Sequence, residues 1–172
     1  ELQDYYHLPA DNKYDRIVSV GMFEHVGRLN YRRFFNKVVD VLADDGVMVL
    51  HSICQPYPAI YNSPWMEKYI FPGGYIPAAS EVLPAIEKAG LLVSDIEFLP
   101  MHYAHTLRHW RQRFMARRQE GGALYDERFV RMWEFYLAAS EMAFTHENFA
   151  VFQMQIVKKR TAVPDNRDYI CR

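Results

Sequence analysis

Hydrophobic positions in the first third of the chain follow a strand pattern, then a helix pattern, then a strand pattern again. Residues 16–20 form a β-branched run ending at Gly21, typical of a strand buried on both faces of a parallel sheet. Apolar residues then recur at helical spacing after Asn30, which can cap a helix, and an Asp-Asp-Gly turn at 44–46 predicts where that helix ends. Residues 47–52 predict a second buried strand, so this region predicts a βαβ unit.

The rest of the chain alternates loop, helix and strand. Residues 55–79 carry five prolines, two adjacent glycines and six aromatic residues, which predicts a long, lid-like loop. Ser80 is expected to cap a helix that ends at Gly90, with Pro84 tolerated in its first turn. The other predicted elements are a strand at 91–99, a helical region at 106–148 broken at Gly121-Gly122, a strand at 151–157 and a loose polar tail.

Polar side chains follow the ends of the predicted strands. Glu24 and His25 come after the first strand, and His51 ends the second. His102 and Tyr103 come after the third. In an open α/β sheet, ligands bind at the carboxyl ends of the strands, so we expect a site at this edge. Each residue taken alone is better explained as a helix cap or a satisfied core residue, and only their convergence indicates a site.

Composition narrows the class of protein. The 172 residues carry 20 Lys and Arg against 21 Asp and Glu, half are hydrophobic, and no basic excess favours nucleic acid as a partner. There is no membrane-spanning run and no secretory signal. Cys54 and Cys171 form no CxxC pattern, which favours a reducing cytoplasm over a disulfide framework. We expect one α/β domain over 1–159 and a polar tail over 160–172.

Three stretches of the chain resemble the cyclopropane fatty acid synthases and the related mycolic acid cyclopropane synthases. They are YDRIVSVGMFEHVG at 14–27, VLHSI at 49–53 and KYIFPGGYIP at 68–77. The resemblance implies a Rossmann-like class I methyltransferase sheet with helices on both faces. None of the eight glycines forms Gly-x-Gly. We therefore expect this chain to be the C-terminal part of a longer polypeptide, with the N-terminal strands and the glycine-rich cofactor loop of the family lying upstream.

The resemblance also implies a reaction. A methyl group passes from S-adenosylmethionine to a cis double bond in an unsaturated phospholipid acyl chain, and loss of a proton then closes a cyclopropane ring. The family holds a bicarbonate ion at the reacting carbons with side chains that match Glu24, His51 and Tyr103. The Cys whose backbone completes that cage has no counterpart here, because neither Cys54 nor Cys171 occupies its position.

The chemistry of these three side chains agrees with that role. An alkene that accepts a methyl group becomes a carbocation, so the site needs a base that is not itself methylated and must exclude water. Tyr103 and His51 can donate hydrogen bonds to a small anion, and Glu24 can accept one from it. The residues matched to the S-adenosylmethionine pocket are Gln3, Asp4 and Tyr5 at the adenine, and Val20 and Gly21 at the methionine part.

Three alternatives for the function stay open. A sibling enzyme could form a methyl-branched or other product from the same cation. A small-molecule methyltransferase could share the fold, although Glu24, His51 and Tyr103 together disfavour it. The chain could also be a non-catalytic lipid-binding fragment. Acyl chain length, headgroup and a homodimeric assembly are left open.

Two further patterns have competing interpretations. His102, His105 and His109 have a spacing that would suit zinc on one helix, but His102 falls at a strand-to-helix junction and we expect no metal site. Arg108, Arg111, Arg113, Arg117 and Arg118 form a basic amphipathic stretch. Such a stretch suits either an anionic lipid surface or a solvated helix face. The first choice implies peripheral attachment at the cytoplasmic face of the inner membrane.

Overall fold

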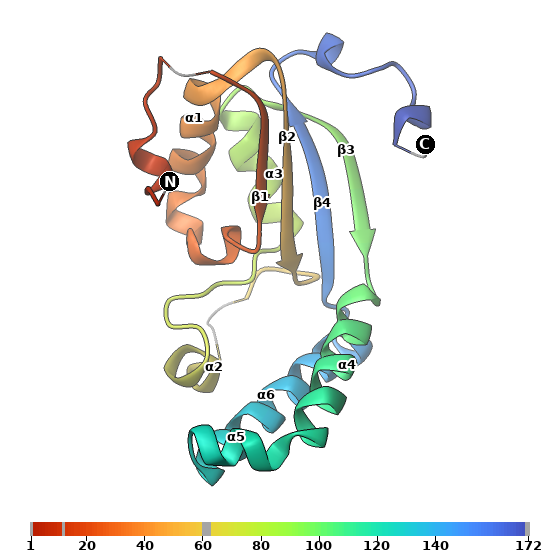
Figure 1. Cartoon of the computed structure of the whole chain (residues 1–172). Coiled ribbons are helices and arrows are strands. Elements are labelled where there is room, and N and C mark those ends of the chain that lie inside the picture. Colours follow the sequence, from red (N-terminus) through yellow and green to blue (C-terminus); the bar gives the residue numbers. More distant parts are fainter. Residues whose placement is uncertain (1, 12, 60–62, 171–172) are drawn as a thin grey trace. The chain divides into compact units, whose positions relative to one another are not determined.

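The computed structural model of the chain describes residues 2–11, 13–59 and 63–170. It contains two compact units (Figure 1). The sheet unit comprises Glu1–Glu97 and Phe152–Arg172, and the helical unit comprises Phe98–Val151.

The sheet has four strands in the order β1-β2-β4-β3. Strand β1 (Tyr14–Val20) pairs in parallel with β2 (Leu42–Cys54), and helix α1 (Tyr31–Val41) connects them. The βαβ prediction is therefore confirmed. Lys158, directly after β4 (Ala150–Val157), donates a hydrogen bond to the carbonyl of Leu42 at the start of β2, so β4 runs antiparallel to β2. With β3 (Leu92–Leu99) at the far edge, the fold is α/β as predicted.

The junction between α1 and β2 differs from the prediction. Strand β2 begins at Leu42, and the Asp-Asp-Gly sequence at 44–46 lies inside it instead of ending the helix. The pairing changes from Tyr14 opposite Leu42 to Arg16 opposite Val47, so the extra residues of β2 form a bulge. Asn30 precedes α1, but its side chain donates to the carbonyl of Val26 at 2.9 Å and makes no cap.

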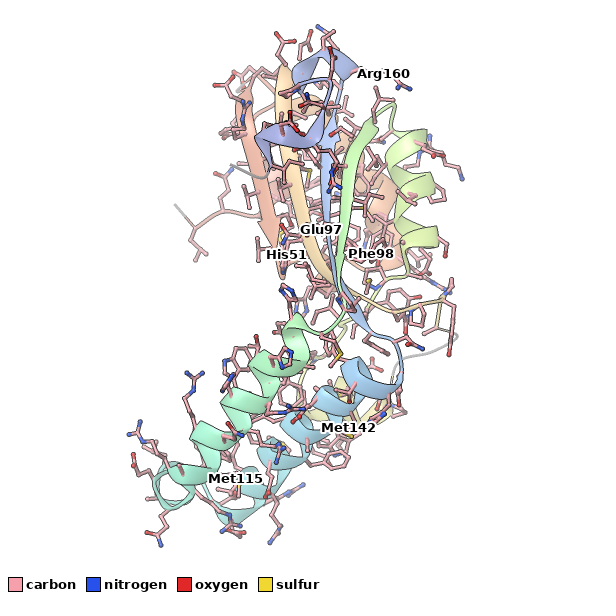
Figure 2. All side chains as sticks on the ribbon, turned by 90° about the vertical axis from the view of Figure 1, so that its right-hand side faces the viewer. His51, Glu97, Phe98, Met115, Met142 and Arg160 are labelled. Carbon is pink, nitrogen blue, oxygen red and sulfur yellow. The ribbon has the colours of Figure 1, made fainter. Side chains whose placement is uncertain are left out.

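One face of the sheet carries the core. Helices α1 and α3 (Ala79–Lys88) lie together on that face (Figures 1 and 2), over the buried side chains of Met48 and Leu50. On the other face Val18 is 69% exposed and Val20 is 62% exposed. The prediction that β1 is buried on both faces is therefore wrong within the described residues, because no helix of the sheet unit covers this face of β1 and β1 forms an edge of the sheet.

Helix α3 begins and turns differently from the prediction. Ala78 occupies the cap position, and its N–H donates to the Glu81 carboxylate at 2.9 Å, so Ser80 is not the cap. Pro84 lies in the second turn, beyond the first turn expected for it. The predicted end at Gly90 is confirmed, because Gly90 has a φ of +78° and closes the helix in the left-handed conformation.

The helical unit contains α4 (His102–Ala116), α5 (Arg118–Leu124) and α6 (Glu127–His146). Gly121 and Gly122 lie inside α5, so the predicted break there is wrong. A Cβ on Gly121 would lie 3.2 Å from the Phe114 ring, which indicates that this glycine permits close packing. The helical region is interrupted between α4 and α5 and again between α5 and α6. Before α6, the Asp126 carboxylate accepts the Phe129 N–H at 2.6 Å as a helix cap.

Short elements and the tail complete the structure. Within the loop at 55–79, of which 60–62 lie outside the described residues, Pro64–Tyr69 form α2. In the described part of the tail, which excludes Cys171, Arg167 pairs with Asp95 of β3 at 2.6 Å. Within the described residues, no helix has the length and hydropathy needed to cross a membrane.

The described residues also form short 3₁₀ helices. They are η1 (Tyr5–His7), η2 (Phe23–His25), η3 (Arg28–Asn30), η4 (Arg160–Ala162) and η5 (Arg167–Tyr169).

Candidate active site at the carboxyl ends of β1 and β2

Glu24 is a buried carboxylate with one occupied oxygen. It lies in η2, directly after β1, and is 9% exposed. Its Oε1 accepts a hydrogen bond from the backbone N–H of Ile53 at 2.8 Å. Its Oε2 is buried and has no hydrogen-bond partner among the described residues. Because a buried carboxylate oxygen without a donor is costly, this atom suits a small ligand that donates a hydrogen bond.

His51 lies on the strand that holds Glu24. His51 precedes Ile53 by two residues in β2, so the side chains of His51 and Ile53 point to the same face of the sheet. Val20 lies opposite His51 in the β1–β2 register, and the N–H of Gly21 donates to the His51 carbonyl at 3.2 Å. Figure 2 labels His51. Of the side chains expected at this edge of the sheet, those of Glu24, His25 and His51 lie at the ends of β1 and β2 within the sheet unit, whereas His102 and Tyr103 begin α4 in the helical unit.

Gly21 makes the turn that places Glu24. Its φ of +64° is in the left-handed region, which costs glycine little and other residues more. The chain can therefore leave β1 sharply and enter η2, two residues later. A side chain at Gly21 would strain this turn.

Tyr103 belongs to the helical unit. It is the second residue of α4, and its ring lies 5.3 Å from the ring of Phe144 and 6.1 Å from that of Trp110, centroid to centroid. Burial, with a smaller contribution from Tyr103, raises the pKa of Tyr136 to about 12. These contacts fix Tyr103 within its own unit, and its participation in a site with Glu24 and His51 stays a prediction.

A pocket of about 490 Å³ lies beside η2 and contains the three residues matched to the adenine. Asp4 also caps η1, since its Oδ1 accepts the Tyr6 N–H at 2.9 Å. This volume lies in the range for small-molecule sites, about 300–1,000 Å³. Two lining residues, His25 and Val26, belong to the EHVG motif at 24–27, and the sequence analysis did not assign them to the cofactor. The lining residues are Leu2, Gln3, Asp4, Tyr5, Met22, His25 and Val26.

Comparison with known families agrees with this geometry. A family model described as mycolic acid cyclopropane synthetase matches residues 1–154. The chain belongs to this family.

Relatives in the family carry out different lipid methylations. The tuberculostearic acid methyltransferase UfaA1 of Mycobacterium tuberculosis is 36% identical over 156 residues, covering 87% of this chain and 36% of the relative. The cyclopropane-fatty-acyl-phospholipid synthase of Escherichia coli K12 is 38% identical over 153 residues, covering 89% and 39%. The chain thus spans well under half the length of these two relatives.

A solved structure of the family has the same fold. The mycolic acid cyclopropane synthase CmaA1, in complex with SAH and CTAB, superposes with a TM-score of 0.80 at 29% identity. The match covers 88% of this chain and 57% of the CmaA1 chain. The class I methyltransferase fold expected from the sequence is therefore confirmed.

In the described structure, neither the three histidines of α4 nor Cys54 belongs to a cluster that could hold a metal ion. His102 is the first residue of α4, at the strand-to-helix junction expected from the sequence. No group of three or more His, Cys, Asp or Glu residues within the described ranges is arranged to hold a metal ion. Cys54 is buried in the sheet unit, as a small core residue would be.

Most arginines of the basic stretch have acidic partners. Arg108 and Arg111 both bind the buried carboxylate of Glu141, at 2.7 and 3.1 Å. Arg117 binds Glu120 at 2.5 Å, and Arg118 pairs with Glu127. The sequence shows five arginines without an acid between 107 and 118, but the fold supplies acids from α5 and α6. This stretch therefore carries less unbalanced positive charge than expected.

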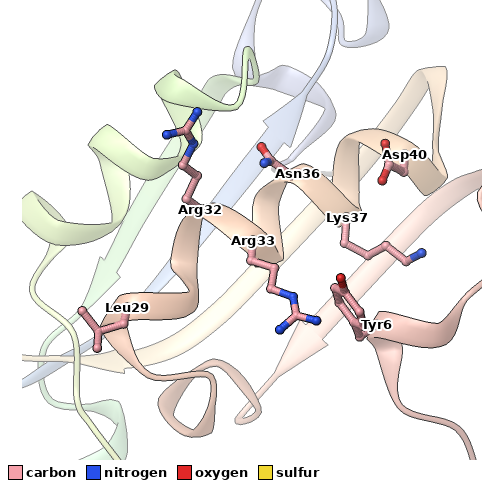
Figure 3. Close-up of a pocket in the computed structure, with 7 residues that line it drawn as sticks. All are labelled: Tyr6, Leu29, Arg32, Arg33, Asn36, Lys37 and Asp40. Atoms are coloured by element: carbon pink, nitrogen blue, oxygen red, sulfur yellow. The ribbon is translucent and has the colours of Figure 1, made fainter.

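Another basic surface lies on α1 (Figure 3). A pocket of about 550 Å³ is lined there by Tyr6, Leu29, Arg32, Arg33, Asn36, Lys37 and Asp40. The Arg33 guanidinium lies 3.5 Å from the centroid of the Tyr6 ring, and Leu29 is 92% exposed. Neither Arg32, Arg33 nor Lys37 forms an ion pair with an acid in the described structure. The sequence reasoning missed this surface because the three cations alternate with core residues of α1.

Proposed function

We propose that the polypeptide containing this chain is an S-adenosylmethionine-dependent methyltransferase that converts cis double bonds in phospholipid acyl chains into cyclopropane rings. The observation that carries the proposal is the buried Glu24 carboxylate, whose Oε2 has no partner among the described residues and which is held at the end of the strand carrying His51. Membership of the mycolic acid cyclopropane synthetase family supports the reaction class.

The residues at the strand ends fit a bicarbonate ion. Glu24 Oε2 would accept a hydrogen bond from the ion's hydroxyl, while Oε1 stays on the Ile53 N–H, which keeps the carboxylate in place. A ring nitrogen of His51 would donate to another oxygen of the ion, and donation from the Tyr103 hydroxyl is the part that the family resemblance alone implies. Bicarbonate, when bound, supplies the base for the proton lost at ring closure.

The pocket beside η2 would form one part of the site for S-adenosylmethionine, which supplies the methyl group when bound. Gln3, Asp4 and Tyr5 line the pocket and are proposed to hold the adenine. Val20 and Gly21, at the end of β1, are proposed to bind the methionine part through their backbone. Both groups of residues lie in the sheet unit, next to Glu24 in sequence or structure.

The product is the finer part of the proposal. UfaA1 and the Escherichia coli cyclopropane synthase are almost equally similar to this chain, so a methyl-branched product is the second candidate. Both products share the methyl transfer and differ in how the cation is quenched. A site that binds a base beside Glu24 favours ring closure over a saturated methyl branch, because ring closure requires loss of a proton from the cation, whereas the saturated branch requires addition of hydride.

Analysis of membrane fatty acids tests the proposal. The complete natural polypeptide, expressed in a bacterium lacking its own cyclopropane synthase, should add one methylene to monounsaturated acyl chains. Gas chromatography with mass spectrometry should show a product that survives mild hydrogenation of alkenes unchanged. A saturated methyl branch or a retained double bond would favour a sibling enzyme. Unaltered lipids despite a folded protein would favour the non-catalytic lipid-binding alternative.

We further propose a peripheral contact with the anionic phospholipid surface at the cytoplasmic face of the inner membrane. The basic pocket on α1 supports it better than α4 does, because three cations there have no acidic partner in the described structure and exposed Leu29 and Tyr6 adjoin them. Cations attract anionic headgroups, and apolar side chains enter the interface beside them. Asp40 at one side of the pocket reduces this charge without cancelling it.

A further inference from the structure

The loop that contains the FPGGYIP motif is tied to the end of β2. We call residues 71–78 the strap. The backbone N–H of Gln55 donates to the carbonyl of Pro77 at 3.0 Å, and the Gln55 side-chain amide donates to the carbonyl of Ile76 at 2.7 Å. Gln55 directly follows β2, so the strap is fixed to the strand that carries His51. The strap is thus tied to β2 at two points, while the lid-like role of the whole loop stays a prediction.

Tyr75, in the middle of the strap, makes two connections. Its backbone N–H donates to the carbonyl of Glu24 at 2.7 Å. Its hydroxyl donates to the Glu81 carboxylate, with both oxygens within reach at 2.8 and 2.9 Å. Glu81 in turn accepts the N–H of Ala78 at the start of α3. One residue therefore connects the backbone of Glu24 to the first turn of a core helix.

The protein around this connection raises the pKa values of two tyrosines. Tyr31, buried against Phe23, is influenced by Glu81 and Tyr75, and burial together with these groups raises the pKa of Tyr31 above its usual range. Burial and the hydrogen bond to Glu81 also raise the pKa of Tyr75. Both phenols therefore stay protonated at neutral pH, and the Tyr75 hydroxyl remains a donor to Glu81.

From these contacts we infer that Tyr75 and Glu81 are positioning residues that hold the backbone of Glu24 through the strap. The inference rests on the proposed function for its catalytic meaning. Element η2 has only three residues and cannot fix its own orientation, so its position depends on contacts from outside. The Ile53 N–H fixes the side chain of Glu24, and the Tyr75 N–H fixes its backbone. A displacement of about 1 Å at a reacting group can cost about 100-fold in rate.

Steady-state kinetics of the complete natural polypeptide test the inference. Tyr75→Phe and Glu81→Ala should each lower kcat about 10-fold and leave KM for S-adenosylmethionine within about twofold. Glu81→Gln keeps an acceptor for both donors and should retain most of the activity. Tyr57→Phe, at a tyrosine that is 72% exposed, is the matched control and should behave as wild type. The double variant Tyr75→Phe/Glu81→Ala should lose no more than either single variant, because the two residues act as one unit.

Amide hydrogen exchange gives a readout that does not need activity. Glu81→Ala should speed exchange at residues 22–26 and 75 while exchange in β2 and the melting temperature change little. Unchanged exchange at these positions, or full kcat in Tyr75→Phe, would overturn the inference. A general loss of protection would also overturn it, since the pair would then serve the whole fold. Failure of the proposed function would instead show as no methylated lipid from the wild-type protein, whatever the exchange result.

Discussion

Glu24 combines burial with an unfilled hydrogen-bonding position. In the described structure, buried carboxylates differ in this respect: Glu141 has two arginine partners, and Glu24 has a single backbone donor. An uncompensated buried oxygen costs stability, so its presence points to a ligand for which the site is built. The contrast supports the proposed ligand-binding role of Glu24 and a structural role for Glu141.

Replacing Glu24 tests its role in chemistry. Glu24→Gln keeps the volume and the acceptor for Ile53 but removes the charge, and it should lower turnover about 10- to 1000-fold in the complete polypeptide. Tyr103→Phe, which removes one donor, should cost less and be partly rescued by added bicarbonate. The measurement is the rate of methyl transfer to lipid vesicles at controlled bicarbonate. Full activity of Glu24→Gln without bicarbonate would rule out the proposed cage.

The Glu141 cluster predicts acid sensitivity of the helical unit. Burial alone would raise the pKa of Glu141, but the hydrogen bonds and charges of Arg108 and Arg111 hold that pKa below its ordinary value of 4.5. The folded state therefore binds this proton less readily than the unfolded state. The resulting stability is complete above the unfolded pKa and is lost as pH falls through the folded pKa.

A substitution isolates this contribution. Glu141→Gln should destabilise the chain by about 1–2 kcal/mol at pH 7, less than for a fully buried pair because both arginines are partly exposed. The difference from wild type should shrink below about pH 4.5. Thermal unfolding followed by circular dichroism between pH 3 and 7 gives the measurement. A difference that is constant over this range would contradict the assignment.

At the scale of elements, α1 and α4 compete as the membrane-facing surface. Both carry several cations. In the described structure Arg108 and Arg111 of α4, and Arg117 and Arg118 after it, form ion pairs with acids, whereas the cations of α1 do not. The variant Arg32→Gln/Arg33→Gln/Lys37→Gln should weaken sedimentation with anionic vesicles at low salt, by about 1 kcal/mol for each charge near the headgroups. Raising the salt should reduce binding of the wild type in the same direction.

A variant with equal charge provides the control. Arg113→Gln/Arg117→Gln/Arg118→Gln removes the same three charges and should bind vesicles nearly as well as wild type. Leu29→Ser should weaken binding, whereas Leu124→Ser, at a leucine that is 78% exposed, should not. Equal losses in the two triple variants would mean that net charge, and no particular surface, controls binding.

Sequence patterns predicted the elements better than their ends. The order of strands and helices was predictable because apolar spacing reflects burial, as it does along α1. The end of α1 was not predictable, because Asp44 and Asp45 suit a bulge as well as a turn. The prediction at Gly121 was wrong because the sequence does not distinguish a glycine that allows close contact with Phe114 from a glycine that ends a helix.

The site was partly predictable for the same reason. Glu24 and His51 could be placed at the strand ends from position alone, whereas the pairing of Tyr75 with Glu81 depends on how a loop returns to a helix. Likewise, the acids that neutralise the α4 arginines come from α5 and α6, including Glu141, about 30 residues away in sequence. Long-range pairs of this kind leave no local periodicity.

For the molecule as a whole, β1 is the weak edge of the sheet unit. It is an outer strand of the described sheet, and Val18 and Val20 are exposed on it. Unpaired strand edges with apolar side chains recruit other chains. The 172-residue chain should therefore self-associate, as measured by sedimentation velocity over a range of concentrations. Val18→Lys should reduce association, and Leu124→Lys should not. Equal effects of the two substitutions would point to general solubility.

Tyr31 and Tyr136, the two buried tyrosines of the described ranges, have an optical consequence. Tyr31 lies in the sheet unit and Tyr136 in the helical unit, and burial raises the pKa of each, to about 12 for Tyr136. In an alkaline titration the ultraviolet absorbance of phenolate therefore rises last from these rings. Replacing either one with Phe assigns its step to one unit. Each late step then reports the burial of one ring in its own unit, and a step that moves down to the range of an exposed tyrosine would mean that the ring has become accessible to solvent.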